Sequence, residues 1–535
     1  MNRRSFFSQA GLTAGALVVA RKGGSAKGRG GDKNKKPPRE QYQASLKGLP
    51  ETNRIRPKVA AGLEPYVPSE QQPWDEQRVG HLLRRTMFGA KLDHIKMALK
   101  KAPGEVVDML LADKPLPNPP GNWVSENWDY DGSSSADRKR DAGRMKQLRN
   151  WWIELMLSDE FSIREKLTLF WHDHFATEYL TVRCPQWEYG YLNTLRKNAL
   201  GNFKQFVTDM TTDPAMLDYL DGRLSTKGRP NENYGRELQE LFTMGVGNYT
   251  EDDIKEAARA LTGWTIPLLV NQRPRYVWAI QSAFVPSRHD DGEKTFLGQT
   301  GNWDYKDIID IIFQQDVTAK FICRKLYREF VYEVADETIV DQLAQIFRRN
   351  NYDLKPVLST LFKSAHFFDN AMIGAHISNP LEFGIGNCRS LNISNSNIDY
   401  LFLEGKVLGM EIFQPPNVAG WPAYRTWISS SLLPTRWAFS DSIVNGTMPS
   451  KYRFKVDVLA YARLFDDPND ARQLVTDIAT HLINYPMSQN QLNFLLDALL
   501  QGAPEYEWNI DAPNAEFRLR SFLVALLRMP ESQLS

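Results

Sequence analysis

The fold class of this chain can be read from the stretch Asn231-Glu232-Asn233-Tyr234-Gly235-Arg236-Glu237-Leu238-Gln239-Glu240-Leu241-Phe242-Thr243-Met244-Gly245. Asn is a favoured residue at a helix N-cap, and Gly is a favoured residue at a helix C-terminus. Shortly after this stretch, Thr250 precedes three acidic residues, and a second helical run continues to Leu261 before Gly263. The stretch therefore predicts two consecutive helices in a mainly α protein.

Apolar residues recur at helical spacing along most of the chain, which predicts a large multi-helix globular body. The clearest runs are residues 95–101, 145–157, 163–171, 193–210, 308–313 and 318–332. Between residues 115 and 135 the pattern gives way to a loop rich in Pro, Asn, Gly and Trp. Aromatic and β-branched residues around an Asp-Asp-Gly turn predict a small β-excursion near residues 270–300.

The N-terminus begins Met1-Asn2-Arg3-Arg4-Ser5-Phe6-Phe7, followed by an apolar stretch too short to span a bilayer. This pattern predicts a twin-arginine signal peptide over residues 1–20, with cleavage after Ala20 or Ala26. The protein is then expected in the periplasm or outside the cell. Residues 21–70 are predicted to form a flexible basic linker, because the Gly- and Lys-rich segment that begins it has no apolar periodicity.

Charge separates the N-terminal segment from the body of the chain. Residues 1–40 hold ten Lys or Arg and two Asp or Glu, a net charge of +8, whereas the remaining 495 residues carry −7. Because the positive charge lies in and just after the signal, nucleic acid is not expected as a partner. After signal removal no transmembrane segment is expected. The three scattered cysteines do not suggest a disulfide framework or a metal knuckle.

The body divides into two predicted parts. A main helical domain is expected over residues 74–445, and a plainly amphipathic helical region packed on it over residues 446–535.

His172 and His174 are the first candidate site residues, in the segment Phe170-Trp171-His172-Asp173-His174-Phe175. A spacing of two lets both imidazoles reach one metal ion where the helix has ended. Asp173 or Glu178 is positioned to add a carboxylate ligand or to orient an imidazole. The alternative is that both histidines are core residues with satisfied hydrogen bonds.

A second candidate group lies on the first helix of the opening stretch. Asn233, Glu237 and Glu240 share one helix face, as a metal site or a general acid/base pair requires. The same pattern is typical of a solvated helix, in which Arg236 pairs with Glu240.

Three further candidates lie elsewhere. His289, just before the Asp-Asp-Gly turn, is a possible third metal ligand or proton-transfer group. Arg84 and Arg85 lie at a helix end, where they can hold an anionic substrate or cap backbone carbonyls. The sequence has no phosphate-binding loop, GxSxG elbow, HExxH or dinucleotide fingerprint.

A rigid loop follows later in the chain, Gln414-Pro415-Pro416-Asn417-Val418-Ala419-Gly420-Trp421-Pro422. Its tryptophan is suited to stacking on a sugar or a peptide, and equally to locking the loop onto the core.

Five segments occur in order along the chain, at residues 84–89, 164–175, 233–245, 249–264 and 415–422. Together they closely resemble the domain-of-unknown-function 1800 family over about residues 74–445. The resemblance implies an exported, largely helical bacterial protein, often encoded beside a partner of the domain-of-unknown-function 1501 family, which looks like the sulfatase and alkaline phosphatase superfamily. It implies no established activity. Family members often have Gly-Gly where this chain has Ala423-Tyr424.

Two hypotheses follow. In the first, the protein is a metal-dependent hydrolase-like enzyme in which His172, His174, His289 and Glu237, with Glu240 as a further candidate, hold a divalent ion and a bound water. Arg84 or Arg85 then orients an anionic substrate. In the second, it is a non-catalytic binding or partner protein of a sulfatase- or phosphatase-like protein or of a polysaccharide. Convergence of the four metal-site residues in one cleft would distinguish these hypotheses.

Overall fold

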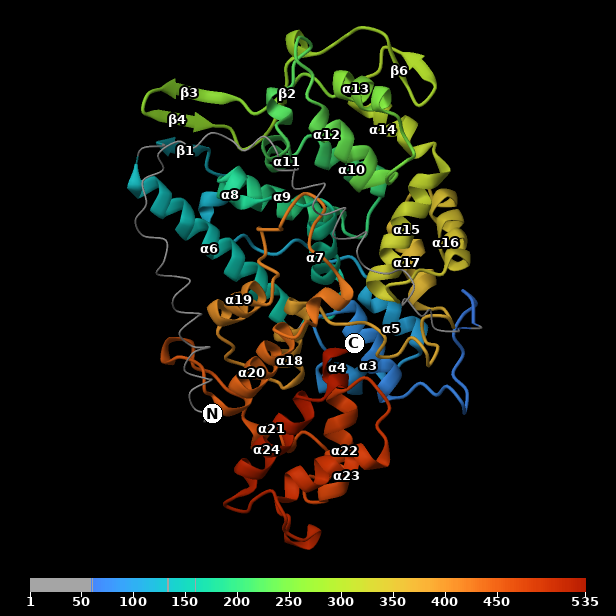
Figure 1. Ribbon diagram of the computed structural model, residues 1–535, viewed down its shortest axis with the longest axis vertical. Helices are drawn as coiled ribbons and strands as arrows, with labels where there is room; N and C mark the ends of the chain where they lie inside the picture. Colours follow the sequence, from blue (N-terminus) through green and yellow to red (C-terminus); the bar gives the residue numbers. More distant parts are fainter. Residues whose placement is uncertain (1–58, 60, 132–133, 159) are drawn as a thin grey trace. The chain divides into compact units, whose positions relative to one another are not determined.

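The computed structural model describes residues 59, 61–131, 134–158 and 160–535. This part of the chain is mainly α-helical, as the sequence predicts (Figure 1). The helices of its first half are α3 (Glu76–Thr86), α4 (Leu92–Ala98), α5 (Pro103–Leu110), α6 (Ser135–Leu157), α7 (Arg164–His174), α8 (Tyr179–Val182), α9 (Pro185–Asn198), α10 (Phe203–Thr211), α11 (Pro214–Tyr219), α12 (Glu232–Glu237) and α13 (Glu251–Ala260).

The second half is built almost entirely from helices. They are α14 (Tyr305–Phe313), α15 (Asp316–Phe330), α16 (Glu337–Arg349), α17 (Leu354–Phe362), α18 (Pro380–Ser390), α19 (Ile398–Val407), α20 (Leu432–Asn445), α21 (Val458–Ala462), α22 (Ala471–Leu482), α23 (Gln489–Leu500) and α24 (Ala515–Leu527). Short 3-10 turns lie at Asn122–Ser125, Gly222–Leu224, Pro286–Arg288, Tyr424–Trp427, Ser450–Tyr452, Glu505–Glu507 and Pro530–Gln533.

The two helices predicted from the opening stretch form with the expected caps. The side chain of Asn231 accepts from the backbone N–H of Asn233, and Thr250 forms a capping box with Asp253. One feature differs from the prediction, because α12 continues into a π-helical turn over Leu238–Thr243. Such a turn inserts an extra residue and rotates the side chains that follow it.

The β-excursion is confirmed as three small antiparallel sheets. Its strands are β2 (Trp264–Thr265), β3 (Leu268–Gln272), β4 (Arg275–Trp278), β5 (Ala283–Phe284), β6 (Lys294–Phe296) and β7 (Gln299–Gly301). The strand β1 (Trp128–Asp131) pairs with β4, although the sequence predicts only a loop there. A four-residue strand is too short to show an alternating pattern, so only its pairing with β4 reveals it.

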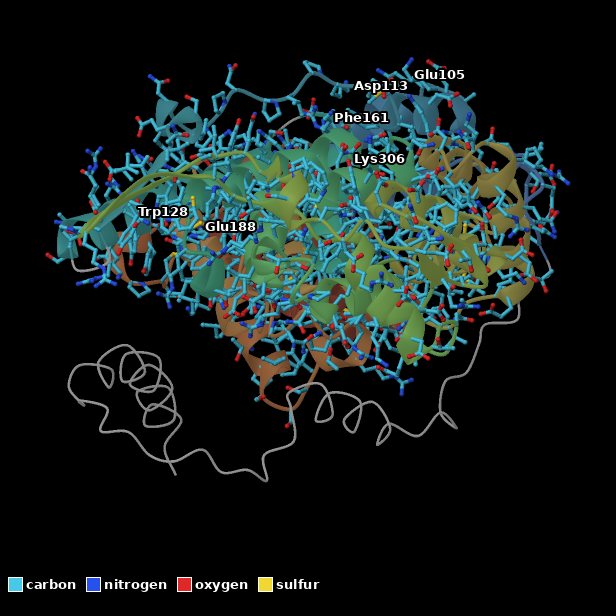
Figure 2. All side chains as sticks on the ribbon, turned by 90° about the horizontal axis from the view of Figure 1, so that it is seen from above. Glu105, Asp113, Trp128, Phe161, Glu188 and Lys306 are labelled. Atoms are coloured by element: carbon cyan, nitrogen blue, oxygen red, sulfur yellow. The ribbon has the colours of Figure 1, made fainter. Side chains whose placement is uncertain are left out.

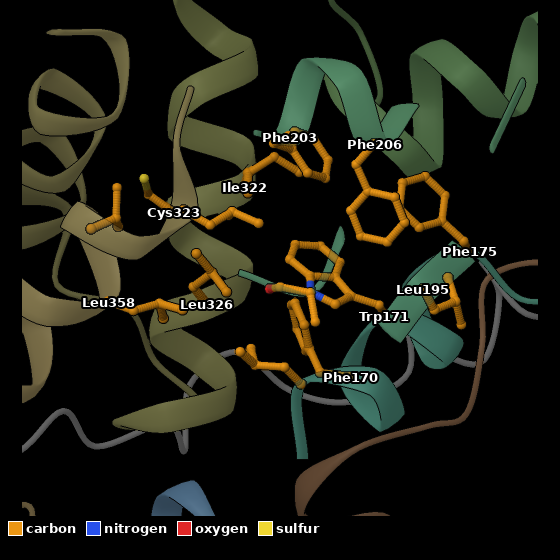
Figure 3. Close-up of a cluster of buried hydrophobic side chains, with 14 of the residues drawn as sticks. Phe170, Trp171, Phe175, Leu195, Phe203, Phe206, Ile322, Cys323, Leu326 and Leu358 are labelled. Carbon is orange, nitrogen blue, oxygen red and sulfur yellow. The ribbon is translucent and has the colours of Figure 1, made fainter. Parts of the chain in front are cut away.

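A buried aromatic cluster occupies the first of two hydrophobic cores. Figure 3 shows Phe170 and Trp171 of α7, and Phe175 just after it, beside Phe203 and Phe206 of α10. The rings of Trp171 and Phe203 stack with their centroids 5.4 Å apart, and Trp171 is fully buried. Aromatic pairs at such distances contribute beyond their buried area, so this cluster fixes α7 against the helices around it.

The second core joins α6 to the C-terminal half of the chain. It includes the buried Trp152 of α6, Phe439 of α20 and Phe522 of α24. The helices α22, α23 and α24, drawn in red in Figure 1, pack against one another in sequence order. Residues 446–535 therefore share a core with residues of the predicted main domain.

The predicted linker ends earlier than expected. The predicted signal peptide and most of the linker lie outside the described residues, but residues 61–70 pack along residues 363–366. The Tyr66 N–H donates to the Lys363 carbonyl at 2.8 Å, and the Tyr66 side chain is buried. Backbone pairing and an aromatic anchor hold this end of the linker in place.

One predicted helix is divided in two. Residues 193–210 were expected to form one helix, but α9 ends at Asn198 and α10 begins at Phe203, after a new N-cap at Asn202. Among the described residues, no helix has the length and apolar composition needed to cross a membrane. Cys184, Cys323 and Cys388 are all buried and unbridged.

Candidate functional site

The N-terminal half of α7 is held by buried ion pairs. Glu165 accepts two hydrogen bonds from the guanidinium of Arg196, at 2.8 and 2.9 Å, and a third from Trp152 Nε1 at 2.9 Å. Glu165 and Arg196 are both buried, so the pair is shielded from water. This arrangement fixes α7 against α6 and α9.

His172 is a structural residue rather than a metal ligand. Its Nε2 accepts from the Phe413 backbone N–H at 3.0 Å, so its proton is on Nδ1, which lies 2.8 Å from the Tyr191 hydroxyl. That hydroxyl donates to the Phe175 carbonyl at 2.9 Å. Burial lowers the pKa of His172 to about 3, so the imidazole is neutral with both nitrogens in use.

His174 has different neighbours. Its Nε2 lies 3.1 Å from the Phe242 carbonyl, which can only accept, so the proton is on Nε2 and Nδ1 accepts from Lys325 Nζ at 2.8 Å. Burial lowers the pKa of His174 well below its usual value, and the charge of Lys325 acts in the same direction. Both ring nitrogens are again in use, but here one of them holds an ammonium group.

The metal centre suggested by the sequence does not form within the described residues. There, no group of three or more His, Cys, Asp or Glu side chains is placed to hold a metal ion. The ring nitrogens of His172 and His174 are occupied by hydrogen bonds to different segments, so neither is left to coordinate. The spacing of two residues placed their imidazoles in different surroundings because α7 continues through both positions.

Asp173, between the two histidines, is partly exposed. Its Oδ1 accepts from the Trp421 backbone N–H at 2.6 Å, which joins α7 to the proline-rich loop. A Cβ atom at Gly420 would collide with the Asp173 carboxylate and its carbonyl oxygen, and Gly420 has a φ of 84°. Only glycine meets both requirements, and this explains the Gly-Trp step of the loop.

Asp173 belongs to a group of charged side chains that we call the central polar cluster. It comprises Arg85 of α3, Lys166 and Asp173 of α7, Lys325 and Glu329 of α15, and Glu382 of α18. Lys166 forms a buried ion pair with Glu382. Glu329 is influenced by the charges of Lys166, Glu382, Arg85 and Asp173. The cluster thus brings together four helices and balances three positive with three negative groups.

Three of these groups have pKa values close to neutrality. Burial raises the pKa of Asp173 to about 6, although the Trp421 N–H and the charge of Lys325 favour its ionised form. Burial lowers the pKa of Lys325 to about 8, opposed by the charge of Asp173. Burial also raises the pKa of Glu329 to about 7, opposed chiefly by the charge of Lys166. Partly exposed groups with such pKa values are suited to proton transfer at neutral pH.

Arg84 and Arg85 are buried and bind backbone carbonyls of distant segments. Arg84 donates to the His481 carbonyl, and Arg85 donates to the carbonyls of Phe330 at 3.0 Å and Glu329 at 2.6 Å. Burial lowers the pKa of each to about 10. The two guanidinium groups therefore join α3 to other segments of the fold, in place of the binding of an anionic substrate that the sequence suggested.

The predicted face of Asn233, Glu237 and Glu240 does not form one site. Asn233 is exposed and Glu237 half-buried, whereas Glu240 is buried and accepts from the Tyr249 hydroxyl. The π-helical turn starts just after Glu237 and rotates the following residues, so regular helical spacing no longer applies. Arg236 pairs with Glu251 at 2.6 Å rather than with Glu240.

His289 lies in another region, at the end of α13. Its Nδ1 donates to the Thr262 carbonyl at 2.9 Å, and its ring contacts Phe284. The turn that follows is anchored by Arg259, whose Nε donates to Asp290 at 2.8 Å. These contacts fasten the β-excursion to α13.

A pair of buried acids lies outside the cluster. Glu188, labelled in Figure 2, is fully buried, and burial raises its pKa well above the usual value, helped by the charge of Asp213. Asp213 caps α11 by accepting from the N–H groups of Ala215 and Met216, and burial raises its pKa to about 7. Such acids are protonated over much of the acidic range and act as buried hydrogen-bonding groups.

Lys325 and Glu329 were missed by sequence reasoning. They are four residues apart in a helix that the sequence does predict, so they share a face. An acid and a base at this spacing are a weak signal on a helix that also carries Lys320, Arg324 and Arg328, because the same pattern is typical of surface ion pairs. Only the packing of α15 beside α7 identifies them.

Comparison with known proteins gives one match. A family model described as "Protein of unknown function (DUF1800)" matches residues 81–534 and so includes most of the C-terminal region. No curated protein matches the chain, and no solved structure matches it.

Proposed function

This chain belongs to the DUF1800 family of proteins of unknown function, and from the geometry of its central polar cluster we propose that it is a hydrolase-like enzyme. The observation that carries the proposal is the pair Asp173 and Lys325. Both side chains are partly exposed, both are held by hydrogen bonds, and their pKa values of about 6 and about 8 bracket neutral pH.

In the proposed reaction Asp173 is the general base. At pH 7 its carboxylate is mainly ionised, and the Trp421 N–H orients it through Oδ1. It removes a proton from a water molecule whose oxygen forms the new bond to the electrophilic atom of the substrate. His174 donates to the Phe242 carbonyl through Nε2, and its Nδ1 accepts from Lys325 Nζ and so orients the ammonium group.

Lys325 is the general acid. As the bond between the electrophilic atom and the leaving group breaks, the leaving group takes a proton from the Lys325 ammonium. Solvent then removes the proton from Asp173 and returns one to Lys325. The lowered pKa makes this ammonium a better donor than an ordinary lysine. The charges of Glu329 and Asp173 interact, so ionisation of Glu329, whose pKa is raised, opposes ionisation of Asp173.

The test is hydrolysis of a panel of chromogenic esters, phosphate and sulfate monoesters and glycosides by the purified protein. Asp173→Asn and Lys325→Met should each lower kcat/KM by about 100-fold or more, the usual contribution of a general acid or base. Lys320→Met is the matched control, because Lys320 lies on the same helix and pairs with Asp341. Wild-type rates in both active-site variants, or no turnover of any substrate, would contradict the proposal.

We also propose that the protein acts in the periplasm or outside the cell after export by the twin-arginine route. The support is the Arg3-Arg4 pair before a short apolar stretch. Changing both arginines to lysine should leave the protein in the cytoplasmic fraction. Normal export of this variant would argue against the route.

A second candidate function is that of a non-catalytic partner, of a protein of the domain-of-unknown-function 1501 family or of a polysaccharide. It is favoured by the motif residues whose polar groups are used inside the protein, such as Glu165, His172 and Arg85. Binding of a purified partner unaffected by Asp173→Asn, with no turnover in the substrate panel, would support this function over the enzyme.

A further inference from the structure

A groove of about 790 Å³ runs along α6, away from the residues of the central polar cluster. Its floor is formed by one face of the helix, which presents Gly143, Gln147, Asn150, Trp151 and Glu154. Its wall is the segment of residues 117–120, three of which are prolines. The volume is within the range of ligand-binding pockets.

A second cavity, of about 500 Å³, continues along the same helix. It shares Glu154 with the first and reaches Leu157 and Ser158 at the end of α6. From Gly143 to Ser158 the helix rises by about 22 Å, since each residue adds about 1.5 Å. The two cavities together therefore suit an extended chain rather than a compact small molecule.

The first cavity combines flat apolar faces with amide groups. Trp151 is held in place because its Nε1 donates to the Asn118 carbonyl at 2.9 Å and the Arg196 guanidinium lies 4.8 Å from its ring centroid. Aromatic and proline faces pack on the apolar faces of sugar rings, and amides such as Gln147 pair with sugar hydroxyls. The Gln147 side chain is exposed in the groove.

The second cavity has a net positive charge, because Arg389 and Lys91 outnumber the single carboxylate, that of Glu154. It is lined by Arg389 and Lys91 together with the side chains of Asn392, Ser394 and Ser396. Arg389 is only 4 % exposed, and its Nη1 is held by the carbonyls of Met156 and Ser158. A buried guanidinium with a neighbouring ammonium and hydroxyl groups is suited to a carboxylate or a sulfate group.

From these features we infer that the α6 groove binds an acidic oligosaccharide. Its sugar rings lie against Trp151 and the prolines, and a carboxylate or sulfate group lies near Arg389 and Lys91. The inference goes beyond the proposed reaction and does not depend on it.

Calorimetric titration of the full-length protein tests the inference with three probes of similar length: an oligogalacturonate, a sulfated oligosaccharide and a neutral cello-oligosaccharide. At least one acidic probe should bind tenfold or more tightly than the neutral one, with affinity falling as salt is raised. Preference for the oligogalacturonate or for the sulfated probe identifies which anionic group is recognised.

Variants at exposed positions separate the two cavities. Asn118→Ala combined with Gln147→Ala should weaken the binding of both acidic probes about tenfold. Ser394→Asp adds a negative charge to the second cavity and should abolish the tighter binding of acidic over neutral probes. Lys139→Ala, exposed on α6 outside the groove, should bind as the wild type does.

Equal binding of acidic and neutral probes, unchanged binding in the groove variants, or absence of binding would each overturn the inference. Binding of a proline-rich acidic peptide in place of all three sugars would overturn it as well.

Discussion

His172 and Asp173 are neighbours on α7, yet they occupy opposite kinds of surroundings. His172 is fully buried, and both ring nitrogens have hydrogen-bond partners inside the protein. Asp173 is partly exposed, and its pKa has moved to about 6. One sequence motif thus contains a fully buried side chain with internal partners and a partly exposed carboxyl group whose pKa lies close to neutrality. Motif membership alone does not distinguish these two roles.

The largest effect is expected at the buried ion pair of the structural region. Glu165→Ala leaves the buried Arg196 guanidinium without its carboxylate and should cost about 3–5 kcal/mol of unfolding free energy. Denaturant titration measures this loss. Arg472→Ala, which removes an exposed pair with Glu505, should cost no more than about 1 kcal/mol. Equal effects of the two variants would show that the Glu165 pair is not a structural anchor.

The next effect is expected at His172. His172→Phe leaves the Phe413 N–H unpaired in the core and should cost about 2–3 kcal/mol. His172→Gln, which can still accept this bond, should recover part of the loss.

The stability difference between wild type and His172→Phe should also depend on pH. The folded pKa of His172 is about 3, below the value of 6.5 expected when unfolded, so its contribution is complete above pH 6.5 and is lost as the pH falls towards 3. The difference should therefore shrink between pH 7 and pH 5. A difference that grows on acidification would contradict the neutral, buried imidazole.

A third, smaller effect tests the contact between Asp173 and the proline-rich loop. Gly420→Ala should cost about 2 kcal/mol, because the new Cβ collides with Asp173 in addition to the strain of a positive φ. Gly502→Ala is the matched control, since Gly502 has nearly the same φ and open space around it. If the two variants lose the same stability, the close approach of the loop contributes nothing.

The smallest effect on stability is expected at Asp173 itself. Asp173→Asn keeps an oxygen to accept the Trp421 N–H, so at pH 4, where the acid is neutral in the folded protein, unfolding free energy should change by no more than about 1 kcal/mol. Because the folded pKa is raised, the stability that the acid contributes is complete below pH 3.8 and is lost as the pH rises through about 6. The variant should therefore be more stable relative to the wild type at pH 8 than at pH 4. A strongly destabilised Asp173→Asn protein would place Asp173 in the structural region with His172.

Local features of the fold were predictable because they depend on neighbouring residues. Asn231 and Thr250 cap their helices as expected, since a cap bonds to an N–H two or three residues away. The π-helical turn after Glu237 was not predictable, because it changes the backbone register without a distinctive residue pattern. The prediction that Glu237 and Glu240 share one helix face was wrong for that reason.

The candidate site was only partly visible. Asp173 and Gly420 lie in two separate motifs, and nothing in their spacing indicates that they touch. Lys325 and Glu329 lie in a correctly predicted helix, but their role depends on which helix packs beside them.

The sequence by itself determined the helical class, the caps at Asn231 and Thr250 and the family of the chain, because these follow from local pattern. Only the tertiary structure decided which motif side chains have all their polar groups bonded inside the protein and which are partly exposed with a shifted pKa. His172 bonds to a residue 241 positions away, and Lys166 to one 216 positions away. Burial and charge are set by such distant partners, and these two quantities fix hydrogen-bond satisfaction and pKa.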